Sequence, residues 1–144
     1  MKKASKRTIS MYLGIALLAA GSTWADSGDT IIATVPFDFM IGKQAVPSGE
    51  YTIRQAGPTK ALVLRTADHR VASVFLTNFT RRIYPQDGTK LVFSRYGSRY
   101  FLREIWVVGE LSGHQLPRSA AEMEASMTAA NNGTPDEIVV VAAR

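Results

Sequence analysis

Two segments of alternating apolar and polar residues meet at a short turn, and they restrict the possible folds of this chain more than any other feature. Thr89–Tyr96 and Arg99–Val108 are joined by Gly97-Ser98. This pair suits a two-residue loop in which glycine takes a positive φ. The pattern therefore predicts an antiparallel β-hairpin.

A two-residue loop also fixes which residues face each other, because side chains alternate between the two faces of a strand. The predicted pairs are Arg95 with Tyr100, Phe93 with Leu102, and Leu91 with Glu104. The predicted core face carries Leu91, Phe93, Arg95, Tyr100, Leu102, Glu104 and Trp106. The second face is expected to be half exposed and carries Val92, Ser94, Tyr96, Arg99, Phe101, Arg103 and Ile105.

Further apolar segments separated by turn residues predict five more strands. Pro36 lacks a backbone donor, so the first of these strands is expected to lie at a sheet edge or to carry a bulge there. Ala67-Asp68-His69 is expected to form a short hairpin loop. The last strand, Ile-Val-Val-Val-Ala, is expected to be buried. The five strands are Thr30–Phe39, Glu50–Gln55, Lys60–Thr66, Arg70–Thr80 and Ile138–Ala142.

One helix is predicted late in the chain, at about residues 119–131. Ser119 and Glu122 have the spacing of a capping box, in which the serine side chain accepts a hydrogen bond from the backbone of the glutamate. Good helix formers follow, and Asn131-Asn132-Gly133 ends the helix.

The predicted fold class is mainly β. Seven strands joined by short turns give a small antiparallel meander that forms a barrel or a two-layer sandwich, with one C-terminal α-helix and a final strand. The chain contains no cysteine. Its stability must therefore come from an apolar core, without disulfides or a zinc site built on thiolates.

The N-terminus has the pattern of a secretory signal. A cluster of basic residues precedes the uncharged segment Met11–Ala20, and Thr23-Trp24-Ala25 places small side chains where a signal peptidase cleaves. We predict a signal peptide at residues 1–25 and a single β domain at 26–144, exported to the periplasm or secreted. The apolar segment is shorter than the about 20 residues that a bilayer requires, and no transmembrane segment is predicted in the mature chain.

The charge of the mature chain bears on its partners. The full chain has 17 basic and 12 acidic residues, and four of the basic ones lie in the predicted signal peptide. The remaining 13 basic residues nearly balance the acidic ones. A nearly neutral exported domain lacks the basic surface of a nucleic-acid-binding protein, so nucleic acid is not expected as a partner.

Aromatic residues and arginines are concentrated in the predicted hairpin. Arg95, Tyr100, Glu104 and Trp106 are the candidate ligand contacts, because side chains of this kind can line a pocket for a small amphipathic ligand. The alternative is that they form cross-strand and cation–π contacts that stabilise the hairpin.

Asp38 and Glu104 are the acids best placed for hydrolytic chemistry, since both lie within apolar strands. Glu104 on the core face is expected to serve either as a buried acid in a ligand site or as the partner of an arginine on a neighbouring strand. The arginines considered for this ion pair are Arg65 and Arg54.

The two histidines do not suggest a metal site, which normally needs three or four convergent ligands. His69 fits a turn residue in a left-handed conformation. His114 lies in the predicted loop Ser112-Gly113-His114 and has no sequence neighbour to orient it. No G-x-S-x-G nucleophile pattern is present. We expect neither a metal nor a cofactor.

Several strings of residues resemble a family of small, exported, uncharacterised β-rich proteins of acidobacterial type. The strings are VPFDF (Val35–Phe39), PSGEYTI (Pro47–Ile53), LVFSRYGSRYFLREIW (Leu91–Trp106) and LPRSAAE (Leu116–Glu122). The third contains the pattern RYGxRYFLxExW. The resemblance implies export and a shared β fold, but it supplies no activity. Family members often carry glycine at the position of His69, which agrees with a turn.

Three functions are compatible with these residues. The preferred hypothesis is a non-enzymatic binding module for a small ligand or an envelope protein. The second is a hydrolytic enzyme that uses Asp38 or Glu104. The third is a structural or assembly subunit whose C-terminal strand pairs with a neighbouring molecule.

Overall fold

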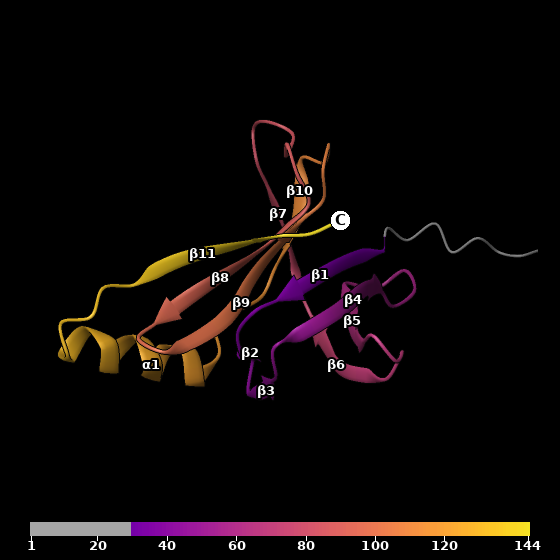
Figure 1. The fold of residues 1–144 in the computed structure, drawn as a ribbon. Coiled ribbons are helices and arrows are strands. Elements are labelled where there is room, and N and C mark those ends of the chain that lie inside the picture. Colours follow the sequence, from indigo (N-terminus) through magenta and orange to yellow (C-terminus); the bar gives the residue numbers. More distant parts are fainter. Residues whose placement is uncertain (1–29) are drawn as a thin grey trace, which may run out of the picture.

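A computed structural model describes residues 30–144 as two antiparallel sheets packed face to face (Figure 1). The predicted signal peptide lies outside the described residues. The first sheet has the order β1-β4-β5-β6 and the second β11-β8-β9-β10-β7. The predicted sandwich-like, mainly β architecture is confirmed, and the sheets of residues 30–144 do not close into a barrel.

The first sheet consists of β1 (Ile31–Val35), β4 (Gly49–Gln55), β5 (Ala61–Thr66) and β6 (Val71–Leu76). The second consists of β7 (Asn78–Arg81), β8 (Lys90–Tyr96), β9 (Arg99–Trp106), β10 (Ser112–Gln115) and β11 (Glu137–Ala142). Two short strands, β2 (Phe39–Ile41) and β3 (Gln44–Val46), form a hairpin, and β2 also pairs in parallel with β9. The helix α1 spans Ala120–Asn131 and precedes β11.

Two predicted strands are each divided between the two sheets. The first predicted strand ends as β1 at Val35 and resumes as β2 after Pro36, because the proline cannot donate a hydrogen bond to the ladder. The strand predicted over 70–80 is interrupted at Thr77, whose backbone N–H and hydroxyl both bond to Lys60 O. In addition, β3 and β10 form in segments that were predicted as loops.

The core lies between the sheets and is filled by apolar side chains from both. Strand β11 and the residues after it complete the core, since Val139 and Val141 pack against it. Arg144 and Ile32 exchange backbone hydrogen bonds at 2.8 and 3.0 Å, which join the end of the chain to β1. The fully buried core residues include Val35, Ile53, Leu64, Leu91, Phe93 and Ile105.

The β8–β9 hairpin has the predicted register only near its turn. Arg95 lies opposite Tyr100 and Phe93 opposite Leu102, as predicted. The register then shifts by one residue, because Arg103 on β9 has no partner on β8. The predicted pair of Leu91 with Glu104 is wrong for this reason: Leu91 lies opposite Ile105.

This bulge exchanges the faces of the residues that follow it in β9. Ile105, expected on the half-exposed face, is fully buried in the core with Leu91. Glu104 and Trp106, expected on the core face, lie together on the outer face of the sheet, where the indole Nε1 of Trp106 donates to Glu104 Oε2 at 2.7 Å.

Helix α1 begins as predicted, with the side chain of Ser119 accepting a hydrogen bond from the backbone N–H of Glu122 at 3.1 Å. Its buried face is formed by Glu122, Ala125 and Ala129, and the two alanines pack against aromatic residues of the hairpin. Met123 and Met127 face solvent. The helix therefore covers the outer face of the sheet at its hairpin end.

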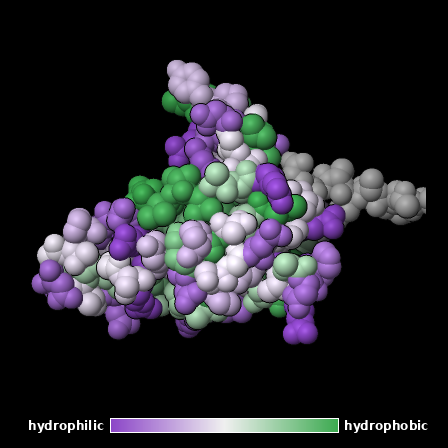
Figure 2. Space-filling view, in the orientation of Figure 1, coloured by the Kyte–Doolittle hydropathy of each residue, from purple (hydrophilic) through white to green (hydrophobic). Residues whose placement is uncertain are grey.

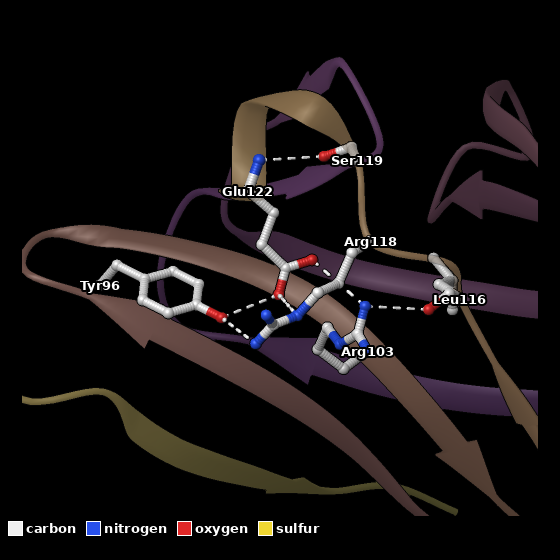
Figure 3. Close-up of polar contacts among 6 residues, drawn as sticks. All are labelled: Tyr96, Arg103, Leu116, Arg118, Ser119 and Glu122. Atoms are coloured by element: carbon white, nitrogen blue, oxygen red, sulfur yellow. Dashed lines mark hydrogen bonds and ion pairs between the residues drawn. The ribbon is translucent and has the colours of Figure 1, made fainter. Parts of the chain in front are cut away.

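A buried carboxylate joins this helix to the hairpin (Figure 3). The side chain of Glu122 is only 3% exposed; it accepts hydrogen bonds from Tyr96 Oη at 3.0 Å and from Arg103 Nη1 at 3.2 Å. Arg103 also donates to Leu116 O at 3.0 Å, and Arg118 lies 3.9 Å from Glu122. Burial of the phenol, together with its bond to Glu122, raises the pKa of Tyr96. A buried charge is stable only when it is paired in this way.

The final strand forms where it was predicted, but it is not buried. It is an edge strand whose outer face is left uncovered by α1, so Ile138 is 74% and Val140 56% exposed. Figure 2 shows the resulting apolar patch over β11.

Replacing Arg103 by alanine tests the role of the buried pair. The substitution would leave the buried carboxyl group of Glu122 without its main cation, so we expect Arg103→Ala to lower the free energy of unfolding by about 3 kcal/mol. Urea denaturation followed by circular dichroism measures this loss. The matched control is Arg118→Ala, whose half-exposed side chain should contribute about 1 kcal/mol or less. Equal effects of the two substitutions would contradict a buried clamp centred on Arg103.

Candidate functional site

The four residues singled out in the hairpin fall into two separate groups. Arg95 and Tyr100 form the first, in which the guanidinium lies 5.4 Å from the centre of the phenol ring. The Tyr100 ring also stacks on Phe37, with 3.8 Å between the ring centroids, and Arg95 forms an ion pair with Glu137 at 3.3 Å. These contacts hold the turn end of the hairpin against its neighbours.

Glu104 and Trp106 form the second group, on the outer face beyond the bulge. Arg82 lies 4.7 Å from the indole ring and 3.2 Å from the carboxylate. The predicted partner of Glu104 was Arg65 or Arg54, and this prediction is wrong. Both of those arginines belong to the opposite sheet, whereas the bulge directs Glu104 away from it. The four candidate residues therefore do not converge on one cavity.

Asp38, the other candidate acid, stabilises a turn. Its Oδ1 accepts a hydrogen bond from the backbone N–H of Ser48 at 2.8 Å, which ties the link between β1 and β2 to the start of β4. This contact accounts for the acid among apolar residues without assigning it a reaction.

His69 adopts the left-handed conformation that was predicted for it, with φ at 65°. Its backbone N–H donates to Thr66 O at 2.9 Å and closes the β5–β6 hairpin loop. The neighbouring Asp68 forms an ion pair with Arg70 at 3.1 Å. The turn interpretation of His69 is confirmed.

A cleft of about 230 Å³ opens between the two sheets near β7 and β10. In Figure 1 these two strands extend beyond the first sheet. One part of the lining is apolar and the other is polar. The apolar lining comes from Ile31, Ile53, Leu62, Phe79, Ile105 and Val107, and the polar lining from Arg54, Gln55, Glu110, Ser112 and His114.

His114 is held in this cleft by a residue far away in the sequence. Its Nδ1 lies 2.8 Å from the hydroxyl oxygen of Thr77, and that hydroxyl donates its one proton to Lys60 O at 2.9 Å. We therefore assign the ring hydrogen to Nδ1, because a hydroxyl that donates to Lys60 O accepts from the ring. In the neutral imidazole this leaves Nε2 with its lone pair.

The lone pair of Nε2 is accessible to a ligand. No hydrogen bond to this atom forms within residues 30–144, and no buried side-chain nitrogen or oxygen in that range lacks a partner. Nε2 is therefore not fully buried, and His114 lines the cleft. Burial lowers the pKa of His114 below its ordinary value of 6.5, against an opposing effect of Glu110. The imidazole is consequently neutral at pH 7 and can accept a hydrogen bond.

The strand that carries His114 depends on a close approach between Gly113 and Trp106. A Cβ atom added to Gly113 would lie 2.6 Å from Cε3 of the indole. Only glycine allows β10 to pair with β9 across this buried ring. With Gly113 turned toward Trp106, the alternation of the strand directs Ser112 and His114 to the cleft.

The described part of the chain contains no group of side chains that could bind a metal ion. Across residues 30–144, no three His, Asp or Glu side chains lie together in a way that would hold a metal ion. Likewise, no helix of these residues has the length and apolar character needed to cross a bilayer.

No family model, no curated protein and no solved structure matches this chain. The resemblance in sequence strings described above therefore remains a prediction, and the case for a function rests on the geometry of the site.

The sequence around His114 does not indicate a site, because the residue that orients its ring, Thr77, is 37 residues away. Two signals are present in the sequence. Ser112 and His114 flank a glycine, Gly113, and Trp106 lies seven positions before that glycine. Neither reveals a strand without knowledge of the bulge in β9.

Replacing Gly113 by alanine should displace β10 from Trp106. We expect the variant to lose about 1–3 kcal/mol of stability, because the added methyl group overpacks a buried ring. Urea denaturation measures the loss, and the chemical shifts of the His114 ring report the displacement. Gly88→Ala, at a position where an added Cβ meets nothing within 4 Å, is the control. A Gly113→Ala protein as stable as this control would contradict the close approach.

Protonation of His114 should destabilise the fold. Because the pKa of His114 in the folded state lies below 6.5, the unfolded chain binds the proton more readily. The contribution of His114 to the free energy of unfolding is therefore complete above pH 6.5 and is lost as the pH falls below that value. We expect the stability difference between the wild type and His114→Gln to shrink between pH 7.5 and pH 5. Urea denaturation at several pH values measures it; a difference independent of pH would contradict the lowered pKa.

Proposed function

We propose that the protein is a non-enzymatic binding module that takes a small amphipathic ligand into the cleft beside His114. The observation that carries this proposal is the contact of 2.8 Å between Thr77 and Nδ1 of His114 in the cleft lining, from which we infer that Nε2 is an acceptor. A fixed acceptor in a partly desolvated cleft gives orientation and specificity to a ligand that donates a hydrogen bond.

The size and lining of the cleft indicate the class of ligand. Its volume of about 230 Å³ is below the roughly 300–1,000 Å³ of sites that hold drug-sized molecules. Apolar side chains from both sheets form much of its wall, including Ile53 and Ile105. The ligand expected here has a compact apolar body, such as one aromatic ring, and a hydroxyl or N–H group that donates to Nε2.

The hydrolytic alternative gains less support from the geometry. Asp38 accepts a hydrogen bond from Ser48 in a turn, and Glu104 is engaged by Trp106 and Arg82. Neither carboxylate lines the cleft at His114.

The export of the protein to the envelope, which is predicted from its N-terminus, suits a binding module that captures small molecules outside the cytoplasm.

Binding of p-cresol and indole tests the proposal, since each combines one aromatic group with one hydrogen-bond donor. We expect titration of the ¹⁵N-labelled protein to shift the ring signals of His114 and the amides of β10. His114→Gln should weaken p-cresol binding about fivefold, because a hydrogen bond is worth about 1 kcal/mol.

The matched control is Tyr100→Phe, which removes a hydroxyl from the hairpin group and leaves the cleft intact. Its affinity for p-cresol should equal that of the wild type. The proposed site would be contradicted if neither probe bound the wild type. It would also be contradicted if Tyr100→Phe lost p-cresol binding while His114→Gln kept it.

A further inference from the structure

The outer edge of β11, the side of the strand that faces away from β8, presents main-chain groups that no strand within residues 30–144 pairs. The direction of these groups follows from two hydrogen bonds just after the strand. Ala143 N–H donates to Thr89 O on the β8 side, whereas Arg144 N–H donates to Ile32 O on the other side. Backbone groups alternate along a strand, so those of Ile138, Val140 and Ala142 point outward.

This edge lacks the features that protect edge strands from pairing with other chains. Residues 138–142 contain no charge, no proline and no bulge, and Ile138 and Val140 are exposed on the apolar patch of Figure 2. The β6 edge of the other sheet has an irregular register next to Ala72, and the carbonyl of Ala72 accepts a hydrogen bond from Gln44 Nε2 on β3. An exposed, uncharged edge strand is a template for pairing with another strand.

We propose that β11 pairs with β11 of a second copy of this chain, antiparallel about a two-fold axis at Val139. In this register Ile138 of each copy lies opposite Val140 of the other, and the outward groups of both strands form hydrogen-bonded pairs. The two sheets join into one across the dimer. Such a contact is self-complementary and closes after two copies.

The position of β1 selects this register. Ile32 occupies the edge opposite Arg144, so an incoming strand can extend only as far as Ala142, where β1 and β11 diverge. Pairing about Val139 places Asp136 of the second copy opposite Ala142. The chain before Asp136 contains Pro135, which lacks a donor for further pairing and precedes the start of β11. The incoming strand therefore ends where the free edge ends.

Charge favours the antiparallel arrangement. Asp136 and Arg144 have no ion pair within the described part of the chain. About the proposed axis, Asp136 of one copy lies diagonally across from Arg144 of the other on the same face, within reach of a long side chain. A parallel pair would instead place Asp136 and Glu137 of the two copies together.

Sedimentation equilibrium of the full-length chain tests the proposal, with circular dichroism to confirm that each variant is folded. The wild type is expected to be a dimer at about 100 μM, and Val140→Lys to weaken dimerisation at least about tenfold, because lysine on an edge strand opposes pairing. Val74→Lys is the matched control: it places the same substitution at a 61% exposed valine on the β6 edge and should leave the dimer unchanged. A monomeric wild type, or a dimer that is weakened by Val74→Lys and not by Val140→Lys, overturns the proposal.

Charge reversal tests the register. Asp136→Arg and Arg144→Asp should each weaken the dimer several-fold, and the double variant should restore it, because the diagonal pair is then re-formed with exchanged signs. A double variant no tighter than the weaker single variant overturns the two-fold arrangement about Val139.

Discussion

The bulge at Arg103 is the constraint on which the rest of the structure depends. One unpaired residue in β9 exchanges the two faces of the strand beyond it, so Ile105 enters the core while Glu104 and Trp106 turn outward. The pairing of β10 with the second half of β9 then places His114 opposite Ile105 and Gly113 opposite Trp106. Without the shift, the histidine would face away from the cleft.

The same residue accounts for the position of the helix. The side chain of Arg103 lies on the outer face with Tyr96 and Phe101, where it pairs with Glu122 and holds α1 over the hairpin end of the sheet. The helix is too short to cover the whole outer face, and β11 remains exposed at the opposite side of β8. In the strand order of this sheet β11 and the pair β10–β7 are at opposite ends, so assembly through β11 would leave the cleft open to a ligand.

Local features of the structure follow from the sequence where a single turn or cap determines them. The Gly97-Ser98 loop fixes the first pairs of the hairpin, Ser119 caps the helix, and His69 takes the left-handed conformation of a turn. In each case the controlling residues are within a few positions of one another. The prediction of a mainly β sandwich rests on the same short-range alternation.

The remainder depends on contacts between distant residues. Nothing near Arg103 in the sequence indicates a bulge, because its stabilising partner Glu122 is 19 residues away. The change of sheet at Thr77 depends on Lys60, and the orientation of His114 depends in turn on Thr77. The candidate site could not be predicted for this reason. Glu104 and Trp106 were predicted on the core face because a regular register was assumed, and the bulge interrupts that register.

The register beyond the bulge can be measured directly by nuclear Overhauser effects between α-protons of β8 and β9. Because Ala143 N–H bonds to Thr89 O, the backbone groups of Leu91 point toward β11, and its pair with β9 is of the non-hydrogen-bonded type, with Cα atoms about 4.5 Å apart. The structure predicts a strong contact between the α-protons of Leu91 and Ile105. A strong contact between those of Leu91 and Glu104 would show a regular hairpin and contradict the placement of the core and the cleft described above.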